Sequence, residues 1–185
     1  MRTISPLYRL TACALMAAVL CVLGPMSIPI GPIPVSLTNL VLFVSAYLLG
    51  SGAAVSTLVY LLLGAVGLPV FSGYQGGLAK LAGPTGGYLV GFFLLALLAG
   101  SVVERFYDRP LLCVAGMAVG ELVLYVFGTG WFVFQMQCTL WYALTVCVLP
   151  FLPVDLAKMA LAAWLGPVVR RALEKADLLP GKAKA

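Results

Sequence analysis

Residues 36–66 read SLTNLVLFVSAYLLGSGAAVSTLVYLLLGAV and decide the fold class of this protein. Two apolar runs are joined here by a short Gly-Ser-Gly turn, and neither run contains a charged residue. The charge-free stretch is longer still, because no Asp, Glu, Lys or Arg occurs between Arg9 and Lys80. Such a stretch cannot be the core of a water-soluble protein of 185 residues, whereas a transmembrane helix requires about 20 mostly apolar residues. The sequence therefore predicts an integral membrane protein with several transmembrane helices.

The composition and the placement of the charges support this class. Apolar residues make up 63% of the chain and charged residues only 9%, against about 25% charged residues in a typical soluble domain. The net charge of +5 does not indicate a nucleic-acid-binding protein, because the basic residues flank apolar segments. Most of them lie near the chain ends or in a hinge over 104–109: Arg2, Arg9, Arg105, Arg109, Arg170, Arg171, Lys175, Lys182 and Lys184.

The sequence offers little for catalysis or metal binding. It contains no histidine, which excludes a histidine metal site and a histidine general base. Its five cysteines lie in apolar segments without a C-x-x-C pair, so we expect them to pack as small apolar residues. The stretch GGLAKLAG (76–83) has a lysine but lacks the spacing and the Ser or Thr of a phosphate-binding loop. We predict no metal, no cofactor and no site for ATP hydrolysis.

Seven apolar segments can be distinguished, at about 10–24, 36–50, 52–66, 85–103, 111–127, 138–150 and 153–170. If the last two make one crossing, nine of the eleven Lys and Arg lie on the cytoplasmic side, with Lys80 in an outer loop and Lys158 in the membrane. Merging the second and third segments would instead place Arg105 and Arg109 outside, against the positive-inside rule. We therefore predict an all-α integral membrane protein with six transmembrane helices and both termini cytoplasmic.

We expect a single membrane domain over residues 1–185. The start of the chain resembles a signal peptide but has no A-x-A-like cleavage site, so we interpret it as a retained first helix. The final helix, interrupted by proline, ends near residue 171, and residues 172–185 form a short basic cytoplasmic tail. Whether residues 138–150 belong to the final helix or form a separate outer segment stays open.

The predicted outward loop, residues 67–87, reads GLPVFSGYQGGLAKLAGPTGG. It is either a flexible connector or a lid over a cavity, and its aromatic residues favour the lid. In the lid interpretation, the inner lining and the points of close backbone approach are Phe71, Tyr74, Gln75, Gly76 and Gly77. The loop has one basic residue, Lys80, which faces either an anionic group or water.

Three charged residues fall within predicted membrane depth, where each costs about 2.5–3.5 kcal/mol: Glu121, Asp155 and Lys158. The spacing of three places Asp155 and Lys158 on one helical face, close enough to pair. They form either a structural ion pair or a polar clamp for a ligand, since the carboxylate accepts N–H bonds and the ammonium donates. Glu121 has no evident partner, and its role stays open.

A stripe of small residues marks the first helix, where Ala14 and Ala18 stand four apart. Small residues at this spacing allow another helix to approach closely in lipid. That helix belongs either to this protein or to a partner protein.

Four stretches, in order along nearly the whole chain, resemble the BioY family of biotin-binding S components of energy-coupling-factor (ECF) vitamin transporters. They are PIPVSLTNL (32–40), GLPVFSGYQGGLAKLAGPTGGYLVGF (67–92), LYVFGTGW (124–131) and PFLPVDLAKMALAA (150–163). The resemblance implies a six-helix membrane protein that captures biotin from outside, with Asp155 and Lys158 binding the ligand and the glycine-rich loop closing over it. It also implies that Ala14 and Ala18 dock a transmembrane coupling subunit, which acts with two cytoplasmic ATPases.

The sequence thus predicts a high-affinity, biotin-binding subunit in the cell membrane, embedded in lipid, which is not an enzyme. The ureido group of biotin suits the Asp155–Lys158 pair, and its apolar body suits an aromatic-lined pocket. For the biotin carboxylate, the candidates are Gln75, Lys80 and the loop N–H groups. A stand-alone biotin facilitator is one alternative. A multi-pass membrane enzyme acting on lipid-like substrates is another, but it needs clustered acids or a nucleophile–base pair.

Overall fold

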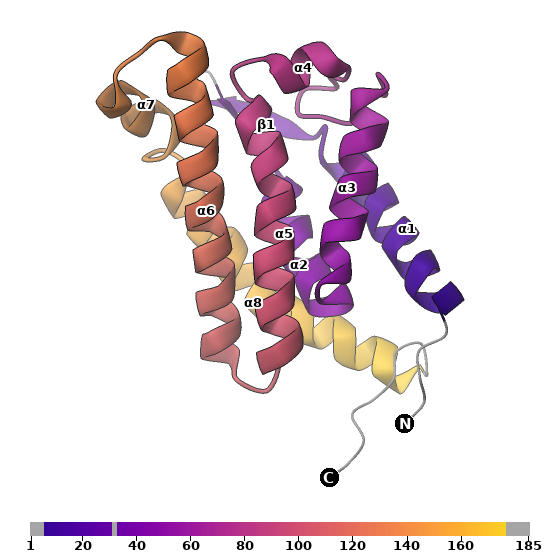
Figure 1. The fold of residues 1–185 in the computed structure, drawn as a ribbon. Coiled ribbons are helices and arrows are strands. Elements are labelled where there is room, and N and C mark those ends of the chain that lie inside the picture. Colours follow the sequence, from indigo (N-terminus) through magenta and orange to yellow (C-terminus); the bar gives the residue numbers. More distant parts are fainter. Residues whose placement is uncertain (1–5, 31–32, 177–185) are drawn as a thin grey trace.

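The computed structural model of the protein describes residues 6–30 and 33–176 (Figure 1). These residues form α1 (Pro6–Leu23), β1 (Ser27–Ile30), β2 (Ile33–Ser36), α2 (Thr38–Leu49), α3 (Gly52–Ala65), α4 (Leu78–Ala82), α5 (Gly86–Phe106), α6 (Pro110–Met136), α7 (Leu140–Cys147) and α8 (Leu152–Lys175). The first residues of the tail predicted over 172–185 belong to α8, because the helix continues through Lys175. Residues 1–5 and the tail from residue 177 onward lie outside this description.

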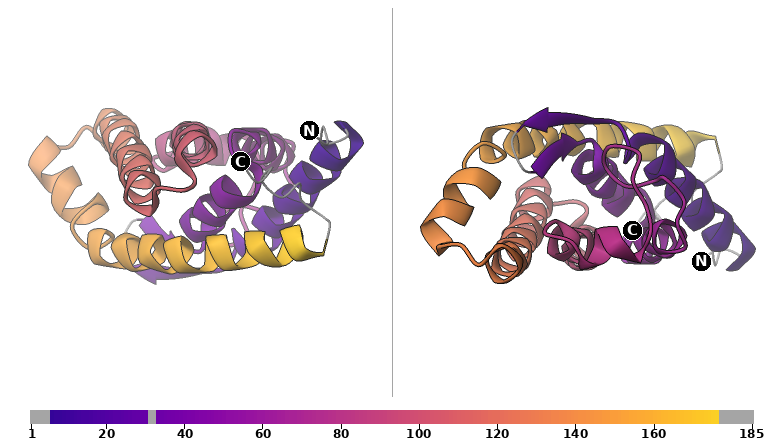
Figure 2. Two further views of the ribbon diagram at one scale, coloured as in Figure 1. Left: turned by 90° about the horizontal axis from the view of Figure 1, so that it is seen from below. Right: turned by 90° about the horizontal axis from the view of Figure 1, so that it is seen from above.

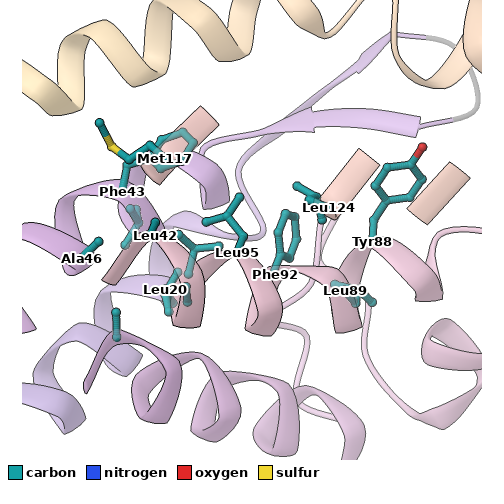
Figure 3. Packing of buried hydrophobic residues seen from close by; sticks show 14 of the residues in the cluster. Leu20, Leu42, Phe43, Ala46, Tyr88, Leu89, Phe92, Leu95, Met117 and Leu124 are labelled. Carbon is teal, nitrogen blue, oxygen red and sulfur yellow. The ribbon is translucent and has the colours of Figure 1, made fainter. Parts of the chain in front are cut away.

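The helices pack around α2, which contacts both α5 and α8. Viewed from below, α6, α5, α3 and α1 follow one another along one side of the molecule, and α8 runs along the other side (Figure 2). The centre is filled by apolar side chains from several helices, including Leu42 of α2, Leu95 of α5 and Met117 of α6, each fully buried (Figure 3). Large apolar side chains also cover the outer surfaces of the helices, as expected for helices that contact lipid.

Three helices of the described residues are long and apolar enough to cross a membrane: α5, α6 and α8. The apolar helices α1, α2 and α3 are shorter. At 1.5 Å per residue, the 12 residues of α2 span roughly 18 Å, against about 30 Å for the hydrocarbon core of a bilayer. The fold is mostly helical, as predicted.

A short β-hairpin, β1–β2, departs from the all-α expectation. The strands pair antiparallel, with Ser27 opposite Ser36 and Pro29 opposite Pro34. Alternating Ile, Pro and Val around a Gly-Pro dipeptide is a hairpin signal. Proline normally argues against a strand because it cannot donate to the ladder. Here the hairpin leads directly into α2 and lies over one end of the helices (Figure 1).

Two helix boundaries also differ from the prediction. The helix predicted over 111–127 continues as α6 to Met136, although Gly128 and Gly130 lower helix propensity. At Gly128 the reason is packing, because a Cβ there would lie 2.3 Å from Cδ1 of Tyr88. Within 138–150, residues Leu140–Cys147 form the separate short helix α7, which Figure 1 shows beside the upper end of α6. Of the two alternatives that the sequence left open for 138–150, the structure shows a separate segment, because α8 begins only at Leu152.

The two ends of the molecule differ in chemistry. At the lower end in Figure 1, the start of α1, the α2–α3 turn and the ends of α5 and α8 meet around a pocket lined by Arg9, Glu104 and Arg170. Glu104 accepts a hydrogen bond from the Ser51 backbone N–H at 2.9 Å, and Arg170 Nη1 donates to the Tyr47 carbonyl at 2.9 Å. At the upper end, the hairpin, α4 and α7 cover the helix ends instead (Figure 1).

Candidate ligand-binding site

A cavity lies beneath the covering segments of the upper end. Residues of the hairpin, α2, the 67–87 loop, α5, α6, α7 and α8 line it: Pro34, Ser36, Asn39, Ser72, Lys80, Thr85, Tyr88, Leu89, Phe92, Leu124, Tyr125, Cys147, Phe151, Asp155 and Lys158. Most of the wall surface is apolar or aromatic, and polar side chains such as Asn39, Lys80, Asp155 and Lys158 stand within it. A concave, mostly apolar site with a small number of placed polar groups is typical of small-molecule binding.

The predicted Asp155–Lys158 pair forms and faces this cavity. Lys158 Nζ lies 2.9 Å from Asp155 Oδ1, and the two residues are 9% and 4% exposed. Both lie in the first two turns of α8, where Pro153 occupies an initial position that needs no backbone donor. The helix dipole favours the carboxylate at this end. An ion pair buried this deeply is therefore held in a fixed orientation at the cavity wall.

A tyrosine that the sequence analysis did not select completes the environment of Asp155. Tyr125 of α6 lines the cavity, and its hydroxyl donates to Asp155 Oδ2 at 2.7 Å. Both carboxylate oxygens therefore have a partner within the protein. Each oxygen keeps a further lone pair, and the Lys158 ammonium keeps two further N–H donors. The cluster can thus accept from and donate to the same polar ligand group.

The third buried charged residue, Glu121, has a partner from a distant segment. Its Oε1 accepts a hydrogen bond from Asn39 Nδ2 at 2.9 Å. Its Oε2 has no hydrogen-bond partner among the described residues. Asn39 lines the cavity, whereas Glu121 is not one of the lining residues. The structure thus gives Glu121 a partner at the site but no direct access to the cavity.

The aromatic wall is provided mainly by α5 and by the residue that precedes α8. Tyr88, Phe92 and Phe151 line the cavity, and Figure 3 shows Tyr88 and Phe92 along the same helix as Leu89. The Tyr88 hydroxyl lies 2.8 Å from Thr129 Oγ1, so its polar end is satisfied within the protein. The ring of Tyr88 can therefore contact an apolar ligand without leaving a buried hydroxyl unpaired.

Lys80 is the basic residue of the 67–87 loop, and it reaches the cavity, which Ser72 and Thr85 of the same loop also line. It lies in α4, a short helix within the predicted loop, and lines the cavity together with Asp155 and Lys158. Partial burial lowers the pKa of the Lys80 amine, because desolvation disfavours the ammonium. An anionic ligand group beside it would offset that effect. Lys80 thus lies at the cavity wall and is also partly exposed.

The other five predicted loop residues do not line the cavity: Phe71, Tyr74, Gln75, Gly76 and Gly77. Phe71 is fully buried beneath the loop, where it packs edge-on against Tyr60 at 5.5 Å between ring centroids. A Cβ on Gly64 would lie 2.1 Å from Phe71 Cζ, so this glycine makes room for the ring. The prediction that Phe71 lines the cavity is therefore corrected, because its ring packs in the hydrophobic core.

The rest of this loop segment forms a hydrogen-bonded turn. Phe71 and Gln75 exchange backbone hydrogen bonds of 2.9 and 3.2 Å. Tyr74 occupies the turn with a φ of 58° and is 68% exposed. The Gly77 N–H donates to the Gly64 carbonyl, and Gly77 has a φ of 90°, which favours glycine. The glycines thus shape a fixed turn that places α4 over the cavity.

The predicted docking stripe lies on the outer face of α1. This helix packs against α2 and α3 and buries Ala17 and Leu20. Ala14 and Ala18 are exposed. The stripe of Ala14 and Ala18 therefore does not pack against another described helix of this protein, which was one of the two interpretations that the sequence left open.

The part of the chain that the structure describes contains no candidate metal-ion site. No group of three or more His, Cys, Asp or Glu side chains is placed there to hold a metal ion. Asp155 and Glu121 instead have hydrogen-bond partners from Lys158, Tyr125 and Asn39. The site is thus built for hydrogen bonding and apolar contact.

Known proteins with similar sequences and structures share one family. A sequence model of the BioY family matches residues 1–175. The biotin transporter BioY2 of Lactococcus lactis subsp. cremoris is 38% identical over 168 residues, which cover 90% of this chain and 92% of the relative. The biotin transporter BioY of Thermotoga maritima is 39% identical over 138 residues, covering 74% and 80%.

A solved structure agrees with these relatives. The crystal structure of the S-component for biotin from an ECF-type ABC transporter superposes with a TM-score of 0.84 at 28% identity, covering 92% of this chain and 95% of that one. Together with its apolar helices, these similarities identify the protein as a multi-pass membrane protein. The chain therefore belongs to the BioY family.

Proposed function

We propose that this protein is the substrate-binding membrane subunit for biotin uptake and that biotin occupies the cavity under the hairpin and α4. The observation that carries this proposal is the Asp155–Lys158 pair, buried at the wall of a mostly apolar cavity. Membership of the BioY family, whose characterised relatives are named biotin transporters, supports the same ligand. A role as an enzyme is not supported, because these relatives are transporters.

Each part of biotin has a matching group in the cavity. In the ureido group, an N–H donor corresponds to the Asp155 carboxylate and the carbonyl acceptor corresponds to the Lys158 ammonium. The fused rings and the aliphatic chain correspond to the apolar wall, which includes Phe92 and Phe151. The carboxylate corresponds to Lys80, whose ammonium it would stabilise against desolvation.

The orientation in the membrane follows from the charges at the two ends. We assign six transmembrane helices, α1, α2, α3, α5, α6 and α8, with both termini cytoplasmic and the cavity near the outer face of the cell membrane. The charged pocket of Arg9, Glu104 and Arg170 lies at the end opposite to the covering hairpin, which supports this orientation. The shorter helices α2 and α3 need not reach the outer surface, because the hairpin and the 67–87 loop complete that end of the molecule.

The partners follow from the ECF-type S component that the fold resembles. We assign Ala14 and Ala18 to the contact with a transmembrane coupling subunit, which would act with two ATPase subunits. Their exposure on α1 supports this assignment, because the small residues leave room for a second helix. Energy from ATP must come from such partners if uptake is active, since this chain has no phosphate-binding loop.

Biotin binding by the purified full-length protein in detergent tests the proposed ligand. We expect tight binding by calorimetry or with radiolabelled biotin, and severe weakening in Asp155→Ala and Lys158→Ala. Glu174→Gln is the matched control, because Glu174 also pairs with a basic residue but lies at the far end of α8. Absence of binding by the wild-type protein would refute the proposal. Uptake by cells that express this chain with and without an ATPase module separates the S component from a stand-alone facilitator.

A further inference from the structure

The Asn39–Glu121 hydrogen bond is a polar feature of the site that the Asp155–Lys158 pair does not explain. Asn39 lies in the first turn of α2 and Glu121 in the middle of α6, 82 positions apart. Both residues are buried, at 7% and 5% exposure. A carboxyl group at membrane depth is costly, so its presence calls for a role. The group that it holds, the Asn39 amide, is at the cavity wall.

This hydrogen bond decides which end of the amide is available to a ligand. Nδ2 donates to Glu121 Oε1 at 2.9 Å. No described residue donates a hydrogen bond to Asn39 Oδ1, which therefore remains a free acceptor. Oε1 can accept this hydrogen bond in either protonation state of Glu121, because a carboxyl group that carries its proton on Oε2 keeps an acceptor at Oε1, although the ionised group is the stronger acceptor.

The ureido group of biotin requires an acceptor of this kind. In a five-membered cyclic urea the two N–H bonds lie on opposite sides of the carbonyl group and point away from each other. One carboxylate therefore cannot accept from both of them. Asp155 can accept from one, while both of its oxygens are already held by Lys158 and Tyr125. The second N–H would be buried without a partner unless another acceptor faces it.

We propose that Asn39 is a further ligand-contacting residue, that its Oδ1 accepts from the second ureido N–H, and that Glu121 is its positioning residue. This inference rests on biotin being the ligand of the cavity. Glu121 and Tyr125 are four positions apart and so share one face of α6. Helix α6 thus fixes both acceptors, Asp155 through Tyr125 and Asn39 through Glu121.

Two biotin analogues, each methylated at one ureido nitrogen, test the contact. Asn39→Leu is expected to weaken biotin binding about tenfold, the usual scale for a lost buried hydrogen bond. Methylation of the nitrogen that faces Asn39 is expected to weaken binding to the wild-type protein about as much, but to weaken binding to Asn39→Leu no further. Methylation of the other nitrogen is expected to weaken binding to both proteins by the same factor.

Variants of Glu121 test the positioning role. Glu121→Gln keeps an oxygen that can accept from Asn39 Nδ2, so it is expected to retain biotin affinity to within about threefold. Glu121→Leu releases the amide and is expected to give the same analogue pattern as Asn39→Leu. The double variant is expected to bind no more weakly than Asn39→Leu alone, because Glu121 acts through Asn39. Ser45→Ala is the control on α2, since Ser45 bonds only the Val41 carbonyl of its own helix.

The possible outcomes separate this inference from the proposed function. If the wild-type protein fails to bind biotin, both fall. If it binds biotin and Asn39→Leu binds as tightly as wild type, the inference alone is overturned. The inference would also be overturned if Asn39→Leu lowered the affinity for biotin and for both methylated analogues by the same factor and also lowered the melting temperature. That result would show that Asn39 stabilises the fold and does not contact the ligand. If Glu121→Gln and Glu121→Leu weakened biotin binding equally, the positioning role of Glu121 would be overturned.

Discussion

Removing both charges of the Asp155–Lys158 pair at once distinguishes a ligand clamp from a structural ion pair. Asp155→Asn alone leaves the Lys158 ammonium without its counter-ion, and Lys158→Met alone leaves the carboxylate without one. The two residues are only 4% and 9% exposed, so each single change is expected to cost about 3–5 kcal/mol of unfolding free energy. For a chain of this length, that loss corresponds to roughly 6–20 °C in melting temperature.

The double variant Asp155→Asn/Lys158→Met is expected to recover most of this stability, because neither charge of the pair is then left buried without the other. The carbonyl oxygen of the new amide can still accept from the Tyr125 hydroxyl, which lies 2.7 Å from the carboxylate in the wild-type protein. The NH₂ group of that amide would then replace the acceptor that faces the ligand. Two charge-assisted hydrogen bonds to biotin are lost, worth about 1.5–3 kcal/mol each. Biotin affinity should therefore remain about 10²- to 10⁴-fold below wild type.

The assay is thermal unfolding of the four proteins in detergent without biotin, followed by calorimetric titration with biotin. Glu174→Gln serves as the control, because its ion pair with Arg170 is partly exposed and is expected to contribute less than about 1 kcal/mol. A double variant that regains both stability and wild-type biotin affinity would refute the clamp and leave the pair a structural role. Single variants with unchanged melting temperatures would refute the argument from burial.

Three further predictions concern the other groups of the site and the docking face. Lys80→Gln is expected to weaken binding of biotin about tenfold or more but to leave binding of biotin methyl ester unchanged, since the ester has no charge to pair. Tyr125→Phe removes the hydrogen bond to Asp155 and should weaken both ligands about tenfold; a loss confined to one ligand would contradict this role. Ala14→Leu/Ala18→Leu should keep biotin affinity and melting temperature but should abolish both co-purification with the coupling subunit and biotin uptake. Ala160→Leu, at an exposed position of α8, is the control and should leave co-purification and uptake unchanged.

Much of the fold could be predicted from the sequence, because hydropathy acts locally along the chain. The apolar segments over 36–50 and 52–66 correspond to α2 and α3 within two residues at each end. The boundaries that differ depend on contacts between segments. Gly128 continues α6 because it meets the Tyr88 ring, and the β1–β2 hairpin pairs two strands although each contains a proline, which normally argues against a strand.

The 67–87 loop shows the same limit within the site. Its composition indicated a lid with aromatic lining, yet Phe71 is drawn into the core by the space above Gly64 and the ring of Tyr60. Lys80, from the same loop, reaches the cavity instead. An aromatic side chain in a loop can fill either the core or a ligand site, and the choice depends on which packing partner lies within reach.

A charge-free stretch and a spacing of three are local properties, so the amino-acid sequence was enough to predict a membrane protein and to place Asp155 and Lys158 on one helical face. The partners of the buried polar groups became evident only in the folded structure. Tyr125 meets Asp155 from 30 positions away, and Asn39 meets Glu121 from 82. Hydrogen bonds between distant segments form only when the helices pack, so the polar arrangement around the cavity belongs to the fold and not to any one stretch of the chain.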